Sequence, residues 1–253
     1  MIYGMYLSAS GIVANSYRQD VISNNLANAE TNGFKRDLAT FYERPTEAAT
    51  RGLGGDCTNP MLELLGGGIL AMPTLVDSGQ GDLESTGNNL DVAIQGKGFF
   101  TVSDGKSTKL TRDGKFNIDS EGLLSLASAP GQHVLDSDGQ PIPVDIRKQT
   151  TIAEDGVIVQ NGKPVNKIGV FDVPNPRDLT KLGGQMMSVP DMKKLVPSAA
   201  TLRSEFLERA NVDPASELSQ LMETQRQLEA NANMIRYQDQ MLDKLVNQVG
   251  KIS

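Results

Sequence analysis

The sequence contains no tryptophan, one cysteine and one histidine, and these scarcities exclude several kinds of site. Cys57 has no second cysteine to pair with, so the chain has no internal disulfide. His133 alone cannot form a histidine cluster for a metal, and we expect it to be a surface or hydrogen-bonded loop residue. Aromatic residues make up only 5% of the chain, which argues against a large aromatic core or a platform for stacking bases.

The charge and hydropathy of the chain exclude other partners. A net charge of −7 opposes binding to the nucleic-acid backbone, which requires clustered lysine and arginine. The sequence has no apolar run long enough to span a membrane, and its N-terminus lacks the basic-then-apolar order of a cleaved secretory signal. We therefore expect no nucleic-acid partner, no membrane insertion and no signal cleavage.

Segments that resemble ligand-binding motifs lack the residues that those motifs need. Gly105-Lys106-Ser107 is similar to the end of a phosphate-binding loop, but Phe100 stands where that loop requires glycine. Gly96-Lys97-Gly98 precedes a strand-like run, whereas a dinucleotide-binding motif opens a helix. The sequence also offers no convergent acid, base and nucleophile. It therefore predicts a protein that is not an enzyme and has no cofactor or metal site.

One uninterrupted helical pattern runs from Asp213 to the end of the sequence. Asp213 can cap the first free backbone donors, and Pro214 suits the first helical position, where its missing N–H costs nothing. Residues at alternating steps of three and four are mostly apolar, which is typical of a coiled-coil seam. This predicted seam consists of Leu218, Leu221, Gln225, Leu228, Ala232, Ile235, Asp239, Leu242, Val246 and Val249.

A second, weaker amphipathic helix is predicted at the N-terminus. Ser16, Gln19 and Ser23 interrupt its apolar spacing. If the two terminal helices pair with each other, the remaining apolar surface faces other subunits. The apolar positions of this N-terminal seam are Ile2, Met5, Ala9, Ile12 and Leu26.

The middle of the sequence has the pattern of a compact antiparallel β domain. Aspartate or asparagine followed by glycine recurs, and this pair supplies the positive φ angles that tight strand reversals need. We expect Val92, Ile94, Phe99 and Phe100 to enter the core. Short apolar runs separate the turns, at Val92–Ile94, Phe99–Val102, Leu123–Leu126, Val157–Val159 and Ile168–Val173.

The fold class that follows is α+β, with long N- and C-terminal helices forming a coiled-coil-like pair and a compact antiparallel β domain inserted between them. Glycine and proline mark the connections on either side of the β domain. Within the first linker, we expect the short Met61–Leu65 segment to be packed. The expected segments are the N-terminal helix and its following turn (1–40), a first linker (41–75), the β domain (76–182), a return linker (183–210) and the C-terminal helix (211–253).

Three segments resemble signatures of the bacterial flagellar rod and hook proteins. Ser23-Asn24-Asn25-Leu26-Ala27-Asn28, followed by Thr31-Asn32-Gly33-Phe34-Lys35-Arg36, is similar to the N-terminal signature. The run from Asn89 to Phe100 resembles the second signature, and Asn211-Val212-Asp213 resembles the third. The three occur in the family's order and cover both ends and the middle, which argues strongly against chance agreement.

The asparagines of the first signature have two interpretations. Asn24, Asn25 and Asn28 lie where a long helix must stop, and asparagine tolerates the left-handed geometry of a helix end. They are an ordinary helix cap under one interpretation, and their amides bridge neighbouring subunits under the other. Gly33 then permits the chain to turn.

The resemblance implies a structural subunit of the flagellar basal-body rod, a drive shaft that transmits torque from motor to hook. It implies polymerisation through the terminal helices, with copies of the chain, other rod proteins, and hook or distal rod subunits as partners. It also implies passage through the flagellar export apparatus without signal cleavage, into the periplasm-spanning rod.

The region from Gly162 to Leu182 resembles the proximal rod member of the family more than the distal one. The chain is too short for the larger outer domains of hook proteins. The alternative is a non-flagellar β-domain binding module with a coiled-coil oligomerisation tail. Such a module gives no reason for the first and second signatures to occur together.

Overall fold

The computed structural model describes residues 2–45, 66–183, 185–191 and 194–249. The Met61–Leu65 segment that the sequence predicts to be packed lies outside these residues. The chain forms two compact units. The helical unit comprises Met1–Leu26, Asp37–Thr74 and Pro214–Ser253, and the β unit comprises Ala27–Arg36 and Leu75–Asp213. The fold is α+β, with a helix at each end and a β-rich middle, as the sequence predicts.

The helical unit contains two long helices and a two-stranded sheet. Helix α1 spans Ile2–Ala27 and helix α4 spans Pro214–Val249, which begins at the proline expected in the first helical position. Strands β1 (Asp37–Glu43) and β2 (Ile69–Val76) pair with each other. None of the described helices combines the length and the apolar character needed to cross a membrane.

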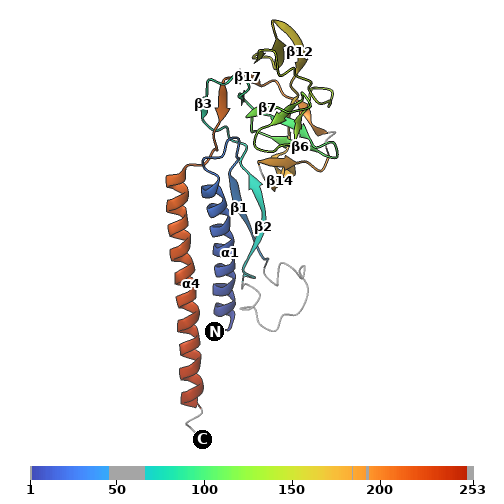
Figure 1. Ribbon diagram of the computed structural model, residues 1–253. Coiled ribbons are helices and arrows are strands. Elements are labelled where there is room, and N and C mark those ends of the chain that lie inside the picture. The colour runs from blue at the N-terminus through green and yellow to red at the C-terminus, as the bar shows by residue number, and fades with distance from the viewer. Residues whose placement is uncertain (1, 46–65, 184, 192–193, 250–253) are drawn as a thin grey trace. The chain divides into compact units, whose positions relative to one another are not determined.

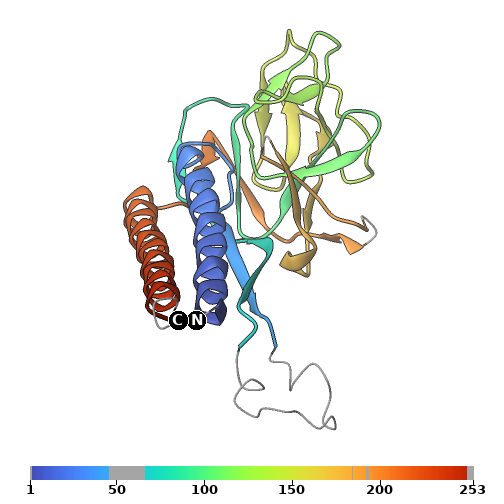
Figure 2. The same ribbon diagram turned by 90° about the horizontal axis from the view of Figure 1, so that it is seen from below.

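Helices α1 and α4 lie side by side in both views (Figures 1 and 2). A Cβ added to Gly4 would lie 2.7 Å from the Nε2 atom of Gln238, and one added to Gly11 would lie 2.7 Å from the Nδ2 atom of Asn231. The two glycines are seven residues apart, and their neighbours on α4 are also seven apart in the opposite order. The helices are therefore antiparallel, and glycine at these positions leaves room for the amide side chains of Gln238 and Asn231.

The α4 face toward α1 alternates between polar and apolar positions. Glu217 and Thr224 are 1% and 2% exposed, and each precedes Asn231 by a multiple of seven residues. Leucine or isoleucine occupies the interleaved positions, and these side chains are half-buried. The apolar set is Leu221, Leu228, Ile235 and Leu242. Thus only part of the stripe that the sequence predicts faces α1.

The β1–β2 sheet packs on α1. The Tyr17 ring meets the Phe41 ring edge to face, with 6.1 Å between the ring centroids. The Tyr17 hydroxyl donates a hydrogen bond of 2.9 Å to the backbone oxygen of Met72, which lies on β2. One α1 side chain therefore contacts both strands of the sheet.

The β unit is built from short antiparallel strands around β5 (Phe99–Ser103). A nine-stranded sheet has the order β14-β15-β6-β5-β9-β8-β7, with β13 paired to β5 and β16. Separate small sheets join β10-β11-β12, β17-β4 and β18-β3. The remaining strands are β3 (Leu83–Ser85), β4 (Val92–Gln95), β6 (Thr108–Thr111), β7 (Phe116–Ile118), β8 (Leu124–Leu126), β9 (His133–Val134), β10 (Thr150–Ile152), β11 (Val157–Gln160), β12 (Lys163–Lys167), β13 (Val170–Asp172), β14 (Thr180–Gly183), β15 (Met186–Ser188), β16 (Val196–Pro197), β17 (Thr201–Ser204) and β18 (Phe206–Glu208), with a 3-10 turn at Pro176–Asp178.

Strand β5 contributes to the two larger apolar clusters of the β unit. Phe100 is fully buried in the larger cluster with Val92 and Ile94, and its ring meets the Phe116 ring edge to face. Phe99 belongs to the second cluster, with Leu110. Successive strand residues point to opposite faces, so two adjacent phenylalanines serve two clusters. The core positions that the sequence predicts are confirmed.

The segment expected to be a return linker contains strands. β17 pairs with β4 and β18 pairs with β3, both antiparallel. Leu202 and Leu207 on these strands are 2% and 4% exposed. The prolines of this segment do not prevent pairing: Pro190 lies outside the strands, and Pro197 lies in the two-residue strand β16, which pairs with β13.

Candidate functional site

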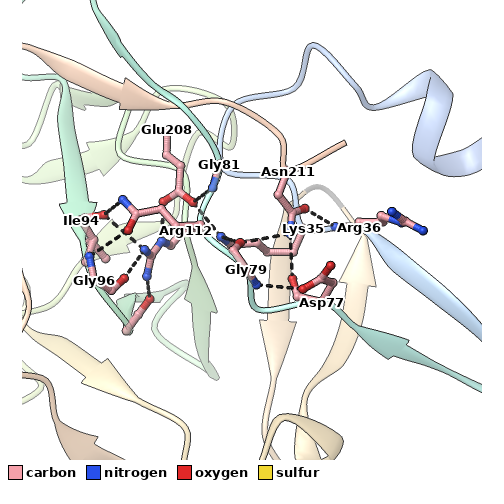
Figure 3. Close-up of polar contacts among 12 residues, drawn as sticks. Lys35, Arg36, Asp77, Gly79, Gly81, Ile94, Gly96, Arg112, Glu208 and Asn211 are labelled. Atoms are coloured by element: carbon pink, nitrogen blue, oxygen red, sulfur yellow. Dashed lines mark hydrogen bonds and ion pairs between the residues drawn. The ribbon is translucent and has the colours of Figure 1, made fainter. Parts of the chain in front are cut away.

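A buried cluster of charge, which we call the polar hub, lies inside the β unit and consists of Lys35, Arg112 and Glu208 (Figure 3). Glu208 Oε1 lies 2.6 Å from Lys35 Nζ, and Glu208 Oε2 lies 2.5 Å from Arg112 Nε. The three side chains are 1–3% exposed. The hub therefore joins the first signature to the segment immediately before the third.

Arg112 extends the hub to the second signature. Its guanidinium donates hydrogen bonds to the backbone oxygens of Ile94, Gly96 and Gly98. The bond to the Ile94 oxygen is 3.2 Å long. One buried side chain thus holds the end of β4 and the turn between β4 and β5, where glycine leaves the carbonyl groups accessible.

The hub contains two cations and one anion in a dry environment. Burial lowers the pKa of the Lys35 ammonium, while the Glu208 carboxylate opposes that shift. Lys35 also donates a hydrogen bond of 2.7 Å to the Gly79 oxygen, and Glu208 accepts one of 2.9 Å from the Gly81 nitrogen. Each charge therefore depends on the other members of the hub, and loss of the anion leaves two buried cations.

Asn211, from the third signature, bonds to two backbone segments beside the hub. Its Oδ1 atom accepts a hydrogen bond of 2.7 Å from the Arg36 nitrogen. Its Nδ2 atom donates to the backbone oxygens of Asp77 and Gly79, at 3.1 Å and 3.0 Å. The Asp77 nitrogen in turn donates to the Arg36 oxygen at 2.9 Å. Figure 3 shows these contacts next to the hub.

The asparagines at the end of α1 differ in their surroundings. Asn25 is 1% exposed, and its amide bonds twice to the backbone of Asp37 within the helical unit, at 2.9 Å each. Asn24 is exposed and Asn28 is half-buried. The Asn25 amide thus serves the fold of its own chain.

Gly33 fixes the turn that follows α1. Its φ angle is +68°, and an added Cβ would lie 2.3 Å from the backbone nitrogen of Asp113. The Gly33 nitrogen donates a hydrogen bond of 2.7 Å to the Glu208 oxygen. The position therefore requires glycine both for its backbone conformation and for the space around it.

Exposed apolar side chains are concentrated on the helical unit. All the large ones among the described residues belong to it, except Ile146, Val165, Leu182 and Val196. Such a concentration is characteristic of an interaction surface. The helical unit exposes Tyr6, Leu7, Val13, Tyr42, Ile69, Leu70, Met72, Leu218, Met222, Met234, Tyr237, Met241, Leu245 and Val246.

The structure places the predicted N-terminal assembly residues on α1. Met5, Ile12 and Leu26 are half-buried, and Ala9 is exposed. Ile2 and Val249 lie on α1 and α4, but their side chains are outside the described part of the structure.

The sequence does not predict that Arg112 and Glu208 belong to a buried site. Arg112 sits beside a turn and Glu208 sits in a presumed linker, and both contexts favour solvated charge. One local feature indicates that Glu208 is buried: it lies between Leu207 and Ala210, which are both buried. His133 lies on β9 and is half-buried, not in a loop. Among the described residues, no group of histidine, cysteine, aspartate and glutamate is arranged to hold a metal.

Comparison with known families matches three separate parts of the chain. Residues 5–35 match the model described as flagella basal body rod protein. Residues 93–160 match the flagellar hook protein FlgE/F/G D1 domain. Residues 203–249 match the flagellar basal body rod FlgEFG protein C-terminal model. Each of these ranges contributes a residue to the hub or hydrogen bonds to it.

Similar proteins align with the chain along nearly its whole length. The flagellar basal-body rod protein FlgG of Bacillus subtilis is 31% identical, over 98% of this chain and 99% of the relative. FlgG of Buchnera aphidicola from Acyrthosiphon pisum is 35% identical, over 97% and 99%. FlgF of Caulobacter vibrioides is 32% identical, over 92% of each chain.

Proposed function

The chain belongs to the family of flagellar basal-body rod and hook proteins, and from this premise we propose that it is a structural subunit of the bacterial flagellar rod. Its place is the flagellar basal body, and its activity is mechanical: it carries torque from motor to hook. Relatives that align with the chain end to end support this function over a binding module with an oligomerisation tail.

The subunit polymerises through its helical unit. Helices α1 and α4 form an antiparallel coiled-coil-like pair, and the apolar side chains that this pair leaves exposed contact neighbouring subunits. The partners are copies of the chain, other rod proteins, and hook or distal rod subunits. The chain reaches the rod through the flagellar export apparatus without signal cleavage.

We favour a proximal position along the rod, on a resemblance that is weaker than the resemblance to the family as a whole. The Gly162–Leu182 region favours the proximal rod member, whereas the relatives include proteins with both the FlgF and the FlgG name. Locating the chain within purified basal bodies by electron microscopy decides between the two positions.

The apolar surface of the helical unit carries the proposal. On α4, Met234, Tyr237, Met241 and Leu245 follow one another at steps of three and four, which places them on one stripe. They are 45–62% exposed in the single chain. Burying such a side chain stabilises an interface by about 1.5–3 kcal/mol, so several of them together support a stable assembly.

The test is a pair of matched substitutions. Tyr237 is 62% exposed on the helical unit, and Ile146 is 60% exposed on the β unit. Tyr237→Asp places a carboxylate in the proposed subunit contact, where desolvation opposes assembly. We expect this variant to fold, to be absent from basal bodies and to abolish swimming. Ile146→Asp is the control and assembles normally.

Incorporation of Tyr237→Asp into rods at the wild-type level, with normal swimming, contradicts the assignment of this surface. The helical signal in circular dichroism for Tyr237→Asp, and the melting temperature of the β unit for Ile146→Asp, check that each variant keeps its fold.

A further inference from the structure

We propose that Asn25 clamps Asp37 within the helical unit, that Asn211 clamps Arg36 within the β unit, and that the two clamps together stiffen the connection through which torque passes between the two units. This inference rests on the proposed function as a torque-transmitting rod subunit. Asn25 holds the connection within the helical unit, and Asn211 holds it within the β unit.

The backbone of this dipeptide is fully occupied by hydrogen bonds. The Arg36 nitrogen donates to Asn211 Oδ1 at 2.7 Å, and the Arg36 oxygen accepts from the Asp77 nitrogen at 2.9 Å. The Asp37 nitrogen donates to Asn25 Oδ1, and the Asp37 oxygen accepts from Asn25 Nδ2, both at 2.9 Å. Every backbone donor and acceptor of the two residues is thus held by the protein.

The boundary between the units falls between these two residues. The chain passes from the β unit to the helical unit between Arg36 and Asp37. The Arg36 groups bond to the β unit, whereas the Asp37 groups bond to the helical unit. Rotation about the backbone bonds at this point must therefore break hydrogen bonds in one unit or the other, unlike rotation in a solvated linker.

Asn211 fastens two further connections to the same point. The chain crosses between the units at three other places, residues 26–27, 74–75 and 213–214, and the last two lie near Asn211 or its partners. Asp77 and Gly79, whose oxygens accept from Asn211, follow the crossing at 74–75, and Asn211 itself precedes the crossing at 213–214. One side chain therefore ties together the β-unit ends of three connections.

The chemistry of this role requires asparagine. A single planar amide supplies an acceptor for the Arg36 N–H and a donor for two carbonyl oxygens. Aspartate keeps the acceptor but presents an oxygen to both carbonyls, and alanine removes every bond. Asn211→Asp therefore loses the bonds to the two carbonyl oxygens, and Asn211→Ala loses these and the bond to Arg36. Asn25→Ala removes the two bonds to Asp37.

The first measurement is amide hydrogen exchange on the purified full chain, which needs no assembly. In Asn211→Ala, we expect exchange at the Arg36 and Asp77 amides to rise by about tenfold, while the Leu110 amide in the core stays protected. Asn211→Asp has a smaller effect at Arg36 because its acceptor remains. The control is Asn175→Ala, which removes a side-chain bond to the Arg177 nitrogen in the same unit.

The second measurement separates stiffening from ordinary structural support. Spin labels at the exposed positions Val13 and Ile146, in a Cys57→Ser background, report the spread of distances between the units. We expect Asn211→Ala and Asn25→Ala to broaden this spread, and Asn175→Ala to leave it unchanged. In cells, rods containing the clamp variants assemble, but swimming speed falls more steeply than in wild type as the medium becomes more viscous.

Unchanged exchange at Arg36, or an unchanged distance spread in both clamp variants, overturns the inference. So does a wild-type response to viscosity in cells whose rods contain Asn211→Ala. Absence of the wild-type chain from basal bodies instead refutes the proposed function, and the exchange and distance results still decide whether the clamp exists.

Discussion

Glu208 Oε1 and Lys35 Nζ lie 2.6 Å apart, although 173 residues of sequence separate them. Glu208 is also the partner of Arg112, so it is the only anion of the hub. Replacing it with alanine leaves two buried cations without a counter-charge. We expect Glu208→Ala to destabilise the β unit by about 3–5 kcal/mol, measured by urea unfolding followed by circular dichroism.

The matched control for this change is Glu84→Ala. Glu84 pairs with Arg209 at 3.7 Å, but its side chain is 64% exposed. An exposed pair contributes about 0–1 kcal/mol, so this variant remains close to wild type. Equal unfolding midpoints for the two variants show that the hub charges are not held as the structure places them.

Gly33→Ala tests the close approach of the first signature to Asp113. Gly87 is the control, since its φ angle of +69° matches the +68° of Gly33 and nothing lies within 4 Å of its added Cβ. Alanine at Gly87 costs about 1–2 kcal/mol through its backbone conformation alone. Gly33→Ala adds a clash with the Asp113 backbone, so its unfolding free energy falls clearly further. Identical losses at the two positions exclude the clash.

Asp113 predicts a pH dependence of stability. Burial raises the pKa of its carboxyl group, and a hydrogen bond from Ser128 opposes that shift. Because the folded pKa lies above the unfolded one, the folded state holds the proton more tightly. Stability contributed by this group is therefore present below the unfolded pKa of about 3.9 and is lost as the pH rises through the folded pKa.

The variant Asp113→Asn carries an amide that cannot ionise, so this contribution disappears. The amide oxygen can accept from the Lys115 nitrogen, which in the wild type donates to Asp113 at 3.0 Å, and the amide nitrogen can donate to the Ser128 hydroxyl. We expect a stability at neutral pH within about 1 kcal/mol of wild type or higher. Urea unfolding between pH 4 and 7 shows a smaller decline for the variant, and an identical pH profile argues against the raised pKa.

Gly11→Leu tests the approach of α1 to α4. The added leucine side chain must occupy the space now filled by the Asn231 side chain. We expect this clash to push the two helices apart. Helices depend on packing more than on intrinsic propensity, so we expect lower helical content by circular dichroism. Ser16→Leu, on an exposed position of α1, is the control and keeps the helical signal. Preserved helicity in Gly11→Leu means that the helices do not require this contact.

The sequence predicts the elements whose signals are local. Pro214 begins α4 as expected, because a missing N–H matters least at a helix start. Val92 and Phe100 are buried as expected, because apolar runs between glycine turns have few other uses. These patterns depend only on neighbours in the chain.

The polar contacts depend on distant partners and are not predictable in this way. No periodic pattern in the sequence marks Arg112 or Glu208, and the two side chains come together only in the folded chain. The α4 seam shows the same limit. Leu218 and Leu221 both fit the predicted stripe, but Leu218 is 48% exposed and Leu221 is half-buried, since only one side of the stripe faces α1.

The distance in sequence between Lys35 and Glu208 also determines when the β unit can fold during synthesis. A chain emerging from the ribosome contains Lys35 and Arg112 long before it contains Glu208. Until then both cations lack the anion that permits their burial, and β3 and β4 lack the strands that pair with them. Contacts between residues so far apart in the sequence form more slowly than local ones. Strands β17 and β18, together with Glu208, thus complete a unit whose other strands precede them in the sequence.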